Sequence, residues 1–539
     1  MKYVVVFDTP SIKQYVFGTD ALREIRGAST NLDRLNRTTM HRKLRDALGS
    51  EPIIDCIYAN GGSAQFIATE VADQELRTAC DKVVALFAQE TAFDVQLVYG
   101  VGEWSEDSAN SYTDAVEKAH FELRARRECG VASGCAVTAP LIAECDSASH
   151  LPASLIMTIA GDEARVLSHS SATKERRGRL AKEHGVWAEW MNSLDQAGPW
   201  PGEDDWDVLR CDSIVNIGEA TDTLDGYVGL VYADGNAMGQ VVQQLDSPEV
   251  YRAFSQIVDS SVRHACFRAL AEACASEIEN IRGGGSQTLP ADILLLGGDD
   301  LLVAVPANRA LQFAQSAARY FQEHTAERIE DHDVQEVRDF FATRDISQMT
   351  ISCGVAVARS TYPFYLLLDL AEELLKSAKR GHVVVQTNQT SPARIDFHVV
   401  AGANSFSLGQ TRRDDYAVSD KPELNGRSVC RTLRPLTVEQ LDKLTKSVQL
   451  LREVNFPKSK LHALHEAALG GTDVQAQRMI RDIFGRCKSA TERNERLALW
   501  KAIEVLQPAG SSFDFPSFVV CEQRVLAVAD IVEAMELLK

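Results

Sequence analysis

Apolar runs alternate with amphipathic segments through the first hundred residues of the chain. The pattern indicates strands where several apolar residues follow one another, and helices where apolar positions recur every three to four residues. The expected elements are a strand, a helix, two strands, a helix and a strand, at 3–8, about 18–48, 53–59, 64–69, 71–89 and 94–99. This β-α-β-β-α-β order is typical of the ferredoxin-like, or split-βαβ, fold.

The same order returns in the middle of the chain. Its elements are expected at 226–233 (strand), 248–281 (helix), 293–296 and 301–305 (strands of a hairpin), 307–328 (helix), 349–358 (strand) and 364–380 (helix). Each hairpin turn contains a glycine pair, Gly61-Gly62 in the first copy and Gly297-Gly298 in the second. The second copy continues with Asp299-Asp300 where the first has Ser63-Ala64. We therefore infer an internal duplication of a palm domain, with the acidic pair kept in the second copy only.

The domain organisation follows from these repeats. We predict an α+β protein with two ferredoxin-like palm domains of the nucleotidyl-cyclase type and a helical C-terminal domain. The predicted limits are 1–125 (first palm), 126–220 (connector), 221–400 (second palm) and 401–539 (linker and helical C-terminal domain). A length of 539 residues agrees with three or four units.

Composition narrows the functional classes. The chain has 56 basic and 76 acidic side chains, a formal charge of −20, which disfavours a dedicated duplex-DNA binder. The acidic charge does not exclude a local basic groove, or a nucleotide held through metal ions. No apolar run reaches the roughly 20 residues that cross a bilayer, and the first strand is not a signal peptide, so we expect a cytoplasmic protein without a membrane partner. Twelve scattered cysteines argue against a disulfide framework.

Three aspartates are the strongest candidates for chemistry. Asp234 ends an apolar strand and precedes Gly235, while Asp299 and Asp300 occupy the tight turn between two apolar strands. In a split-βαβ sheet that first strand and this hairpin are adjacent and central, so the three carboxylates can converge. Hard oxygen ligands suit Mg²⁺ or Mn²⁺, and a pair of such ions can activate an attacking 3′-oxygen and stabilise leaving pyrophosphate. We predict a two-metal catalytic centre.

The Gly-Gly-Asp-Asp motif at 297–300 has a simpler interpretation, because Gly and Asp are also favoured in hairpin turns. Its pairing with Asp234-Gly235-Asn236, about sixty residues earlier on an apolar strand, favours the catalytic interpretation.

Other polar side chains lie on elements that follow. Lys376 and Lys379, on a predicted helix, are candidates to reach a triphosphate as compact positive charges, although a lysine on an amphipathic helix ordinarily lies on a solvated face. Ser352 lies near the start of a strand and is a candidate contact to a base or ribose.

These motifs resemble the large polymerase-cyclase subunit of type III CRISPR effector complexes. The resemblance is carried by Asp-Gly-Asn-Ala-Met-Gly at 234–239 with Gly-Gly-Asp-Asp at 297–300, and by the segments 7–10, 23–29, 352–355, 371–379 and 456–461. It implies conversion of ATP to cyclic oligoadenylate and pyrophosphate in antiviral defence, with one ATP on each palm. The chain is similar, more distantly, to GGDEF-type cyclases.

The resemblance also implies ligands and partners. Metal binding is expected at Asp234, Asp299, Asp300 and the backbone carbonyl of Gly235, and nucleotide binding at Asn236, Gly239, Gly297, Gly298, Ser352, Lys376 and Lys379. Expected partners are ATP and, through the C-terminal helical domain, guide or target RNA and other effector subunits. A stand-alone enzyme is the other arrangement left open.

The chain departs from the family pattern at two places. Many members begin with an HD nuclease domain, whereas this sequence starts directly in the first palm, and its His332-Asp333 dipeptide is assigned to a loop. DNase activity is therefore not expected. Cys129, Cys135 and Cys145 stand where the family often carries zinc, but at spacings unlike tight zinc knuckles, so a degenerate or lost site is expected.

Two other functions compete with the synthase. The palms could be architectural parts of a non-enzymatic scaffold, or the chain could be a sensor that holds ATP without turnover. Clustered carboxylates favour the enzyme, because unpaired acids are costly and tend to be kept for ligands. The first palm, without an acidic pair, is expected to dock a nucleotide or support the second.

Overall fold

The computed structural model describes most of the chain. It leaves out residues 50–51, 105–110, 130–141, 149, 159–163, 181–184, 207, 221–223, 286, 381–390, 401–406, 419–428, 470–472, 486–488, 509, 521–522 and 539. The described residues form two compact units. The first contains residues 1–214, 237–303 and 320–349, and the second contains residues 215–236, 304–319 and 350–539.

The first unit begins with a four-stranded antiparallel sheet in the order β2-β3-β1-β4. Its strands are β1 (Lys2–Asp8), β2 (Ile53–Asn60), β3 (Ser63–Thr69) and β4 (Val98–Trp104). The central strand β1 is almost wholly buried, and its last residue, Asp8, lies opposite Ser63 of β3 and Val98 of β4. The predicted split-βαβ order is thereby confirmed. The last strand was placed too early, because residues before Val98 form a turn in which Phe93 has a φ of 61°.

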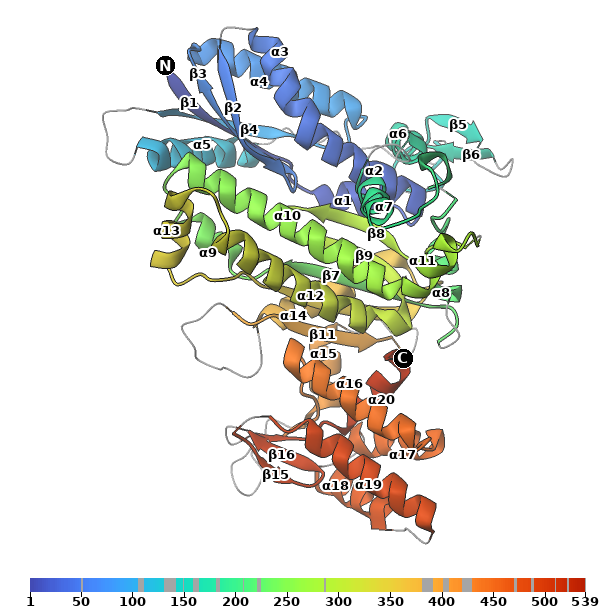
Figure 1. The fold of residues 1–539 in the computed structure, drawn as a ribbon. Helices are drawn as coiled ribbons and strands as arrows, with labels where there is room; N and C mark the ends of the chain where they lie inside the picture. The colour runs from blue at the N-terminus through green and yellow to red at the C-terminus, as the bar shows by residue number, and fades with distance from the viewer. Residues whose placement is uncertain are drawn as a thin grey trace. The chain divides into compact units, whose positions relative to one another are not determined.

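The helices beside this sheet differ from the prediction in the segment 18–48. They are α1 (Ile12–Phe17), α2 (Leu22–Arg34), the π-helical turn η1 (Leu35–Met40), α3 (His41–Leu48), α4 (Asp73–Glu90) and α5 (Ser111–Glu128). The single helix expected at 18–48 starts instead at Leu22 and contains a π-helical turn. Figure 1 shows α5 lying along the sheet, against β4.

A connector follows within the first unit. It contains the hairpin β5 (Leu155–Thr158) and β6 (Ala164–Leu167), then α6 (His169–Leu180), α7 (Val186–Gln196) and the short helix η2 (Glu203–Asp205). Helix α6 crosses α2 at two glycines, Gly27 and Gly178. A Cβ added at Gly27 would lie 1.8 Å from the carbonyl oxygen of Lys174, so the crossing leaves no room for a side chain.

Gly27→Ala is therefore expected to destabilise the first unit by about 1–3 kcal/mol, because the two helix backbones must separate. The drop is measured as a lower thermal or urea midpoint. Gly202→Ala is the control, since an added Cβ there meets nothing within 4 Å. Equal midpoints for Gly27→Ala and the parent chain would contradict the close crossing.

The rest of the first unit comes from the second repeat. It contains α9 (Met238–Val242), α10 (Pro248–Ala273), α11 (Ala275–Arg282), β8 (Asp292–Gly297) and α13 (Gln335–Thr343). Helix α10 starts with Pro248 after Ser247, whose hydroxyl accepts a hydrogen bond from the Val250 backbone. The helix predicted at 248–281 is interrupted at Cys274. His332 and Asp333 lie in the loop before α13, as predicted.

The second repeat forms a six-stranded sheet in the order β14-β11-β10-β7-β9-β8. Besides β8, its strands are β7 (Tyr227–Gly235), β9 (Asp300–Pro306), β10 (Ile351–Arg359), β11 (Arg394–Val399) and β14 (Leu436–Thr437). The accompanying helices are α8 (Ile214–Glu219), α12 (Ala307–Glu330) and α14 (Phe364–Arg380). Strands β7 and β10 are antiparallel, and Asp234 lies opposite Ser352.

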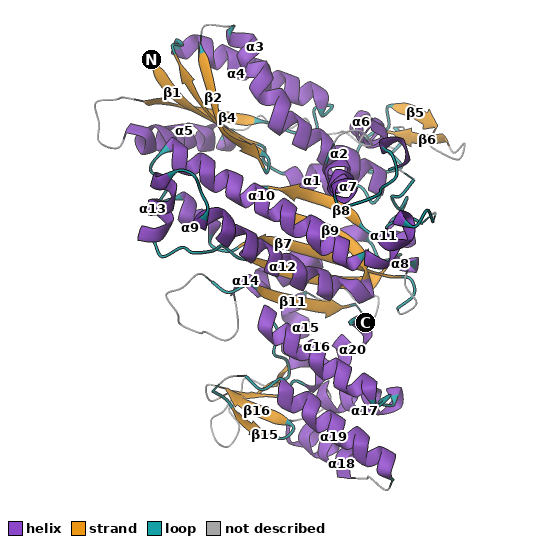
Figure 2. Cartoon of the chain, in the orientation of Figure 1, coloured by secondary structure: helices purple, strands orange, loops and turns teal. Residues whose placement is uncertain are grey.

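The C-terminal part of the second unit is mixed rather than purely helical. Its helices are α15 (Leu408–Thr411), η3 (Arg412–Tyr416), α16 (Val438–Glu453), α17 (Lys458–Leu469), α18 (Asp473–Gly485), α19 (Ala490–Val505) and α20 (Val528–Leu537). A five-stranded sheet contains β12 (Ala417–Val418), β13 (Val429–Cys430), β17 (Gln523–Val525), β16 (Ser517–Val520) and β15 (Ser512–Asp514). Figure 2 shows its short strands beside the helices. Strands of two to four residues are too short to show a period-two pattern.

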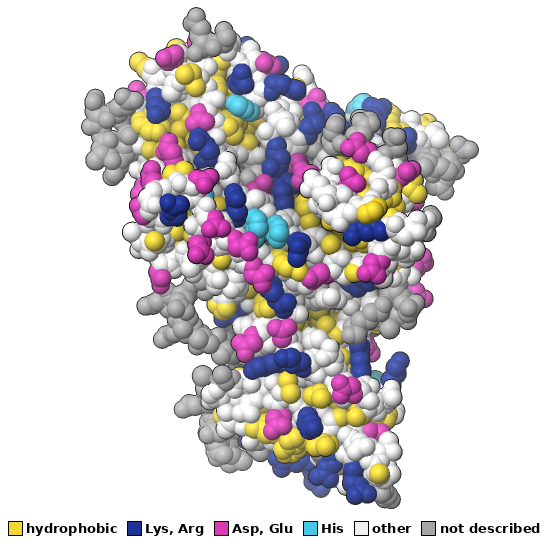
Figure 3. Space-filling model, in the orientation of Figure 1, with side chains coloured by type: hydrophobic (Ala, Val, Ile, Leu, Met, Phe, Trp, Pro, Cys, Tyr) yellow, Lys and Arg dark blue, Asp and Glu magenta, His cyan; other side chains and the backbone are white. Residues whose placement is uncertain are grey.

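Two surface properties bear on partners. Among the described residues, no helix is long and apolar enough to cross a membrane. Over the C-terminal helices, hydrophobic side chains lie beside Lys and Arg on the molecular surface (Figure 3). Leu497 and Trp500 of α19 belong to the exposed hydrophobic residues.

Candidate functional site

The two glycine pairs matched in the sequence come together in the first unit. A Cβ added at Gly61 would lie 3.5 Å from the Cα atom of Gly298, so the backbones of the two hairpin turns are in contact. Gly61, Gly62 and Gly298 have φ angles of 58°, 83° and 63°. Glycine adopts this left-handed conformation without the steric cost that a side chain carries. The duplication thus places two equivalent turns against each other.

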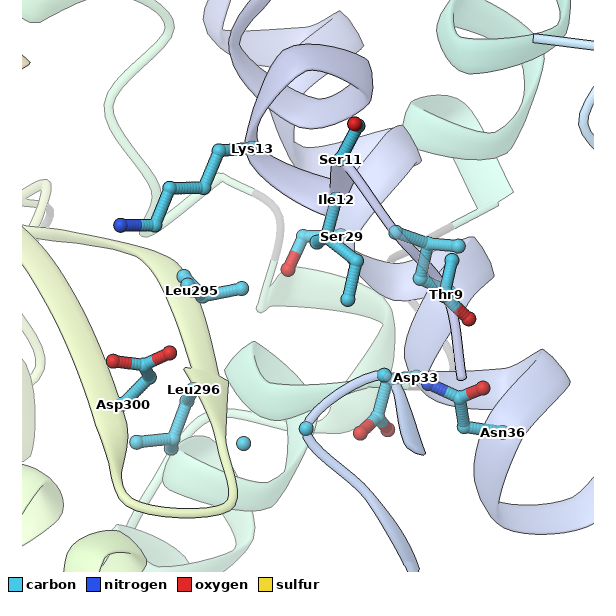
Figure 4. A pocket seen from close by; sticks show the side chains of 14 residues that line it. Thr9, Ser11, Ile12, Lys13, Ser29, Asp33, Asn36, Leu295, Leu296 and Asp300 are labelled. Atoms are coloured by element: carbon cyan, nitrogen blue, oxygen red, sulfur yellow. The ribbon is translucent and has the colours of Figure 1, made fainter. Parts of the chain in front are cut away.

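A cavity of about 340 Å³ opens beside these turns. Its lining residues are Thr9, Ser11, Ile12, Lys13, Ser29, Leu32, Asp33, Asn36, Gly61, Gly62, Leu295, Leu296, Gly297 and Asp300. The volume lies within the range of about 300–1,000 Å³ typical of small-molecule sites. Figure 4 shows Lys13 and Asp300 toward one side of the cavity and Thr9 and Asn36 toward the other. The Asp33 carboxylate lies on the side of Asn36, and Lys13 is the only cationic side chain among the lining residues.

Only one residue of the acidic pair lines this cavity. Asp300 is the first residue of β9 and lines the cavity, whereas Asp299 lies in the turn and is not among the lining residues. Both side chains are half-buried. Of the predicted nucleotide-binding glycines, Gly297 also lines the cavity, and Gly298 forms the contact with Gly61.

Several lining residues were not predicted from the sequence. Lys13, Ser29, Thr9 and Asn36 come from the segment after β1 and from the helices that follow it. Thr9 and Ser29 lie within the segments 7–10 and 23–29, which carry the family resemblance and were the available signal. Nothing in the local pattern distinguishes Asn36 from an ordinary polar helix residue.

The end of β7, in the second unit, carries the third aspartate. The ammonium group of Lys379 forms an ion pair with the Asp234 carboxylate and donates a hydrogen bond of 2.8 Å to the carbonyl oxygen of Gly235. Burial lowers the pKa of Lys379. The structure therefore brings Lys379 to Asp234. Lys376, on the same helix, has a side chain that is 65% exposed and pairs with Glu372 at 3.6 Å.

Asn236 and Ser352 form a hydrogen-bonded network next to Asp234. The Ser352 hydroxyl donates to the side-chain oxygen Oδ1 of Asn236 at 2.9 Å, and the side-chain Nδ2 of Asn236 donates to the Thr350 hydroxyl at 2.9 Å. The Ser352 oxygen also accepts the backbone N–H of Arg394 at 3.2 Å. The buried Ser352 is thus engaged by protein groups and fixes Asn236. Gly239 lies exposed in α9.

The oxygen donors at the end of β7 fit a divalent cation. The Asp234 carboxylate and the Gly235 carbonyl already converge on one positive charge, the Lys379 ammonium. Hard oxygen donors of this kind are those that Mg²⁺ prefers. Within the described ranges, no three His, Cys, Asp or Glu side chains are grouped for metal binding. Mg²⁺ ordinarily uses one or two carboxylates together with substrate phosphates, so this donor set suits an ion that binds with a nucleotide.

The cysteines singled out for zinc do not assemble a site within the described part of the chain. Cys129 is exposed, Cys145 is buried, and Cys135 lies outside the described residues. Burial acts to raise the pKa of the Cys145 thiol, but hydrogen bonds with Ser171 and the Ser168 backbone outweigh it and lower the pKa.

Comparisons with known proteins agree with the palm interpretation. Residues 227–383 match the family model of the second palm domain of Cas10/Cmr2. Among solved structures, a Csm1–Csm4 cassette in complex with cA4 is similar at 14% identity and a TM-score of 0.52, covering 94% of this chain and 69% of that one. Csm1 from T. onnurineus is similar at 13% identity and a TM-score of 0.52, covering 100% and 70%. At these identities the likeness shows the fold. No curated protein matches the chain.

Proposed function

We propose that the chain is a nucleotidyltransferase that converts ATP into cyclic oligoadenylate and pyrophosphate in the cytoplasm, because residues 227–383 match the second palm domain of Cas10/Cmr2. The observation that carries the proposal is the Gly-Gly-Asp-Asp turn of this domain, from which Asp300 faces the 340 Å³ cavity. The solved Csm1–Csm4 cassette of the same fold contains cA4, a cyclic oligoadenylate.

The proposed metal ligands are Asp234, Asp299, Asp300 and the carbonyl of Gly235. Asp234-Gly235 end strand β7 and Asp300 starts strand β9, and both lie within the residues 227–383 that match the palm domain, which supports a shared role. When bound, Mg²⁺ or Mn²⁺ ions would activate the attacking oxygen and stabilise the leaving pyrophosphate. Lys379 holds Asp234 in place through the ion pair.

The remaining predicted residues would bind nucleotide around this centre. Gly297 and Gly298 allow close approach of the substrate to the turn, and Asn236 is fixed by Ser352 at the end of β7. Lys376 and Gly239 stay candidates for phosphate contact. Exposure of Lys376 agrees with a long side chain that reaches a ligand only when one is bound.

We also propose that the chain works with other effector subunits. The exposed Leu497 and Trp500, three positions apart on α19, support a protein-binding role for the C-terminal helices. The cassette relative, in which Csm1 is bound to Csm4, supports assembly in general. Guide or target RNA is the further partner expected of such a complex.

The test is product formation by the purified full chain. The protein is incubated with Mg²⁺ or Mn²⁺ and with ATP, GTP, CTP or UTP, with and without candidate activator RNA. We expect pyrophosphate release with ATP and cyclic oligoadenylate in the mass spectrum. Failure to release pyrophosphate under every condition would overturn the enzymatic proposal for this chain.

A nucleotide sensor is the second candidate, favoured by one observation. The cavity is lined by only one of the three aspartates, which is sufficient for a binding site without chemistry. In that case ATP with Mg²⁺ should raise the melting temperature, because a ligand that binds only the folded state stabilises it. The same samples would contain no product after hours.

A further inference from the structure

The cavity of the first unit contains two buried polar groups without a protein partner. The Thr9 hydroxyl oxygen and the Asn36 carboxamide oxygen both line it, their residues are 4% and 3% exposed, and neither atom forms a hydrogen bond. Native proteins retain few such groups, because an unpaired buried polar atom is costly. Two of them in one cavity point to a ligand that supplies the missing partners.

The position of these groups indicates which part of a nucleotide they meet. Thr9 and Asn36 lie away from Lys13 and Asp300, on the side of Asp33, whose carboxylate pairs with Arg37 at 2.7 Å (Figure 4). The cavity walls include the apolar side chains of Ile12, Leu32, Leu295 and Leu296. A nucleotide has a charged phosphate end, which suits the Lys13 ammonium group, and a flat base whose edge is polar. The base therefore belongs on the side of Thr9 and Asn36.

We propose that Asn36, assisted by Thr9, recognises the exocyclic amine of adenine, so that the palm without the acidic pair sets base specificity. The inference rests on the proposed function, which supplies the nucleotide. The unpaired atom of Asn36 is an acceptor, and it requires a donor. Adenine presents an amine at position 6, whereas guanine presents an acceptor oxygen there.

Local structure holds Asn36 in place for this role. Asn36 belongs to the π-helical turn η1, a type of turn often found at functional sites. The next residue, Arg37, bridges Asp33 at 2.7 Å and Asp259 of α10 at 2.6 Å, which fixes this turn against α10. A side chain on a fixed turn can discriminate between bases that differ by one group.

The decisive measurement is the preference for ATP over purine riboside 5′-triphosphate, which lacks the amine. Isothermal titration uses the full chain with Asp299→Asn, a change outside the cavity lining that the proposed function expects to stop turnover. Asn36→Leu in this background should lower the preference by about tenfold, mainly by weakening ATP binding. Its melting temperature should stay equal or rise, because the buried side-chain oxygen of Asn36 has no protein partner to lose.

Asn31→Leu is the matched control. Asn31 is a buried amide on the preceding helix α2, but it donates to the Glu90 carbonyl at 3.0 Å and does not line the cavity. This variant should lower the melting temperature and leave the base preference unchanged. An unchanged preference in Asn36→Leu, or GTP binding as tightly as ATP to the Asp299→Asn chain, would overturn the assignment. If no nucleotide binds at all, the proposed function itself fails.

Discussion

Replacing Asp299 and Asp300 together by asparagine is expected to reduce cyclic oligoadenylate formation by at least about 10³-fold. Removing a single preorganised group that stabilises developing charge typically costs 10²–10³ in rate, and this variant removes two. Asparagine keeps the size of each side chain, and the half-buried turn loses two adjacent like charges, so the fold should persist. Product is measured by mass spectrometry, and stability by the melting temperature.

The control for this variant changes the same number of charges elsewhere in the first unit. Asp331 and Asp333 are exposed and lie in the loop before α13, so Asp331→Asn with Asp333→Asn should keep full product formation. If the Asp299/Asp300 variant retains product, the catalytic role of the turn is wrong and the scaffold or sensor gains support. If product is lost together with several degrees of melting temperature, Asp234→Asn provides an independent test.

The duplication was predictable because both copies show the same order of short-range hydrophobic patterns. Strand and helix periodicity gave both split-βαβ units, and the two glycine pairs could be matched by inspection. The structure adds that these pairs touch, with Gly61 against Gly298. Backbone contact between two turns 237 residues apart (61 to 298) depends on how the units pack, which periodicity does not encode.

The base-recognition residues could not be predicted for a related reason. No sequence window distinguishes Asn36, because its importance lies in an unpaired oxygen inside a cavity built from four separate segments. Lys379 was predicted to reach a triphosphate; the structure shows its ion pair with Asp234, and the triphosphate contact stays a prediction. Element limits failed where tertiary pairing decides them, as at the start of β4 and in the short C-terminal strands.

Buried charge was equally invisible in the sequence. Asp292, at the start of β8, is 0% exposed and accepts hydrogen bonds from Arg26 of α2 at 2.7 Å and from Arg210 of the connector at 2.7 Å. Arg26 also donates to the carbonyl oxygen of Cys211. One carboxylate therefore joins the first palm, the connector and the strand that leads to the Gly-Gly-Asp-Asp turn.

Asp292→Asn is expected to destabilise the first unit by about 3–5 kcal/mol, since removing one partner leaves buried charges uncompensated. Its apparent melting temperature should fall on the order of 10 °C. The control is Asp55→Asn, which breaks an exposed pair with Arg252 and should cost no more than about 1 kcal/mol. Equal decreases in stability for the two variants would contradict a stabilising role of the buried Asp292 carboxylate. Because β8 leads directly to the turn, product formation by Asp292→Asn should fall as the unit unfolds and recover at lower temperature. The Asp299/Asp300 variant should instead lack product at every temperature, which distinguishes the two.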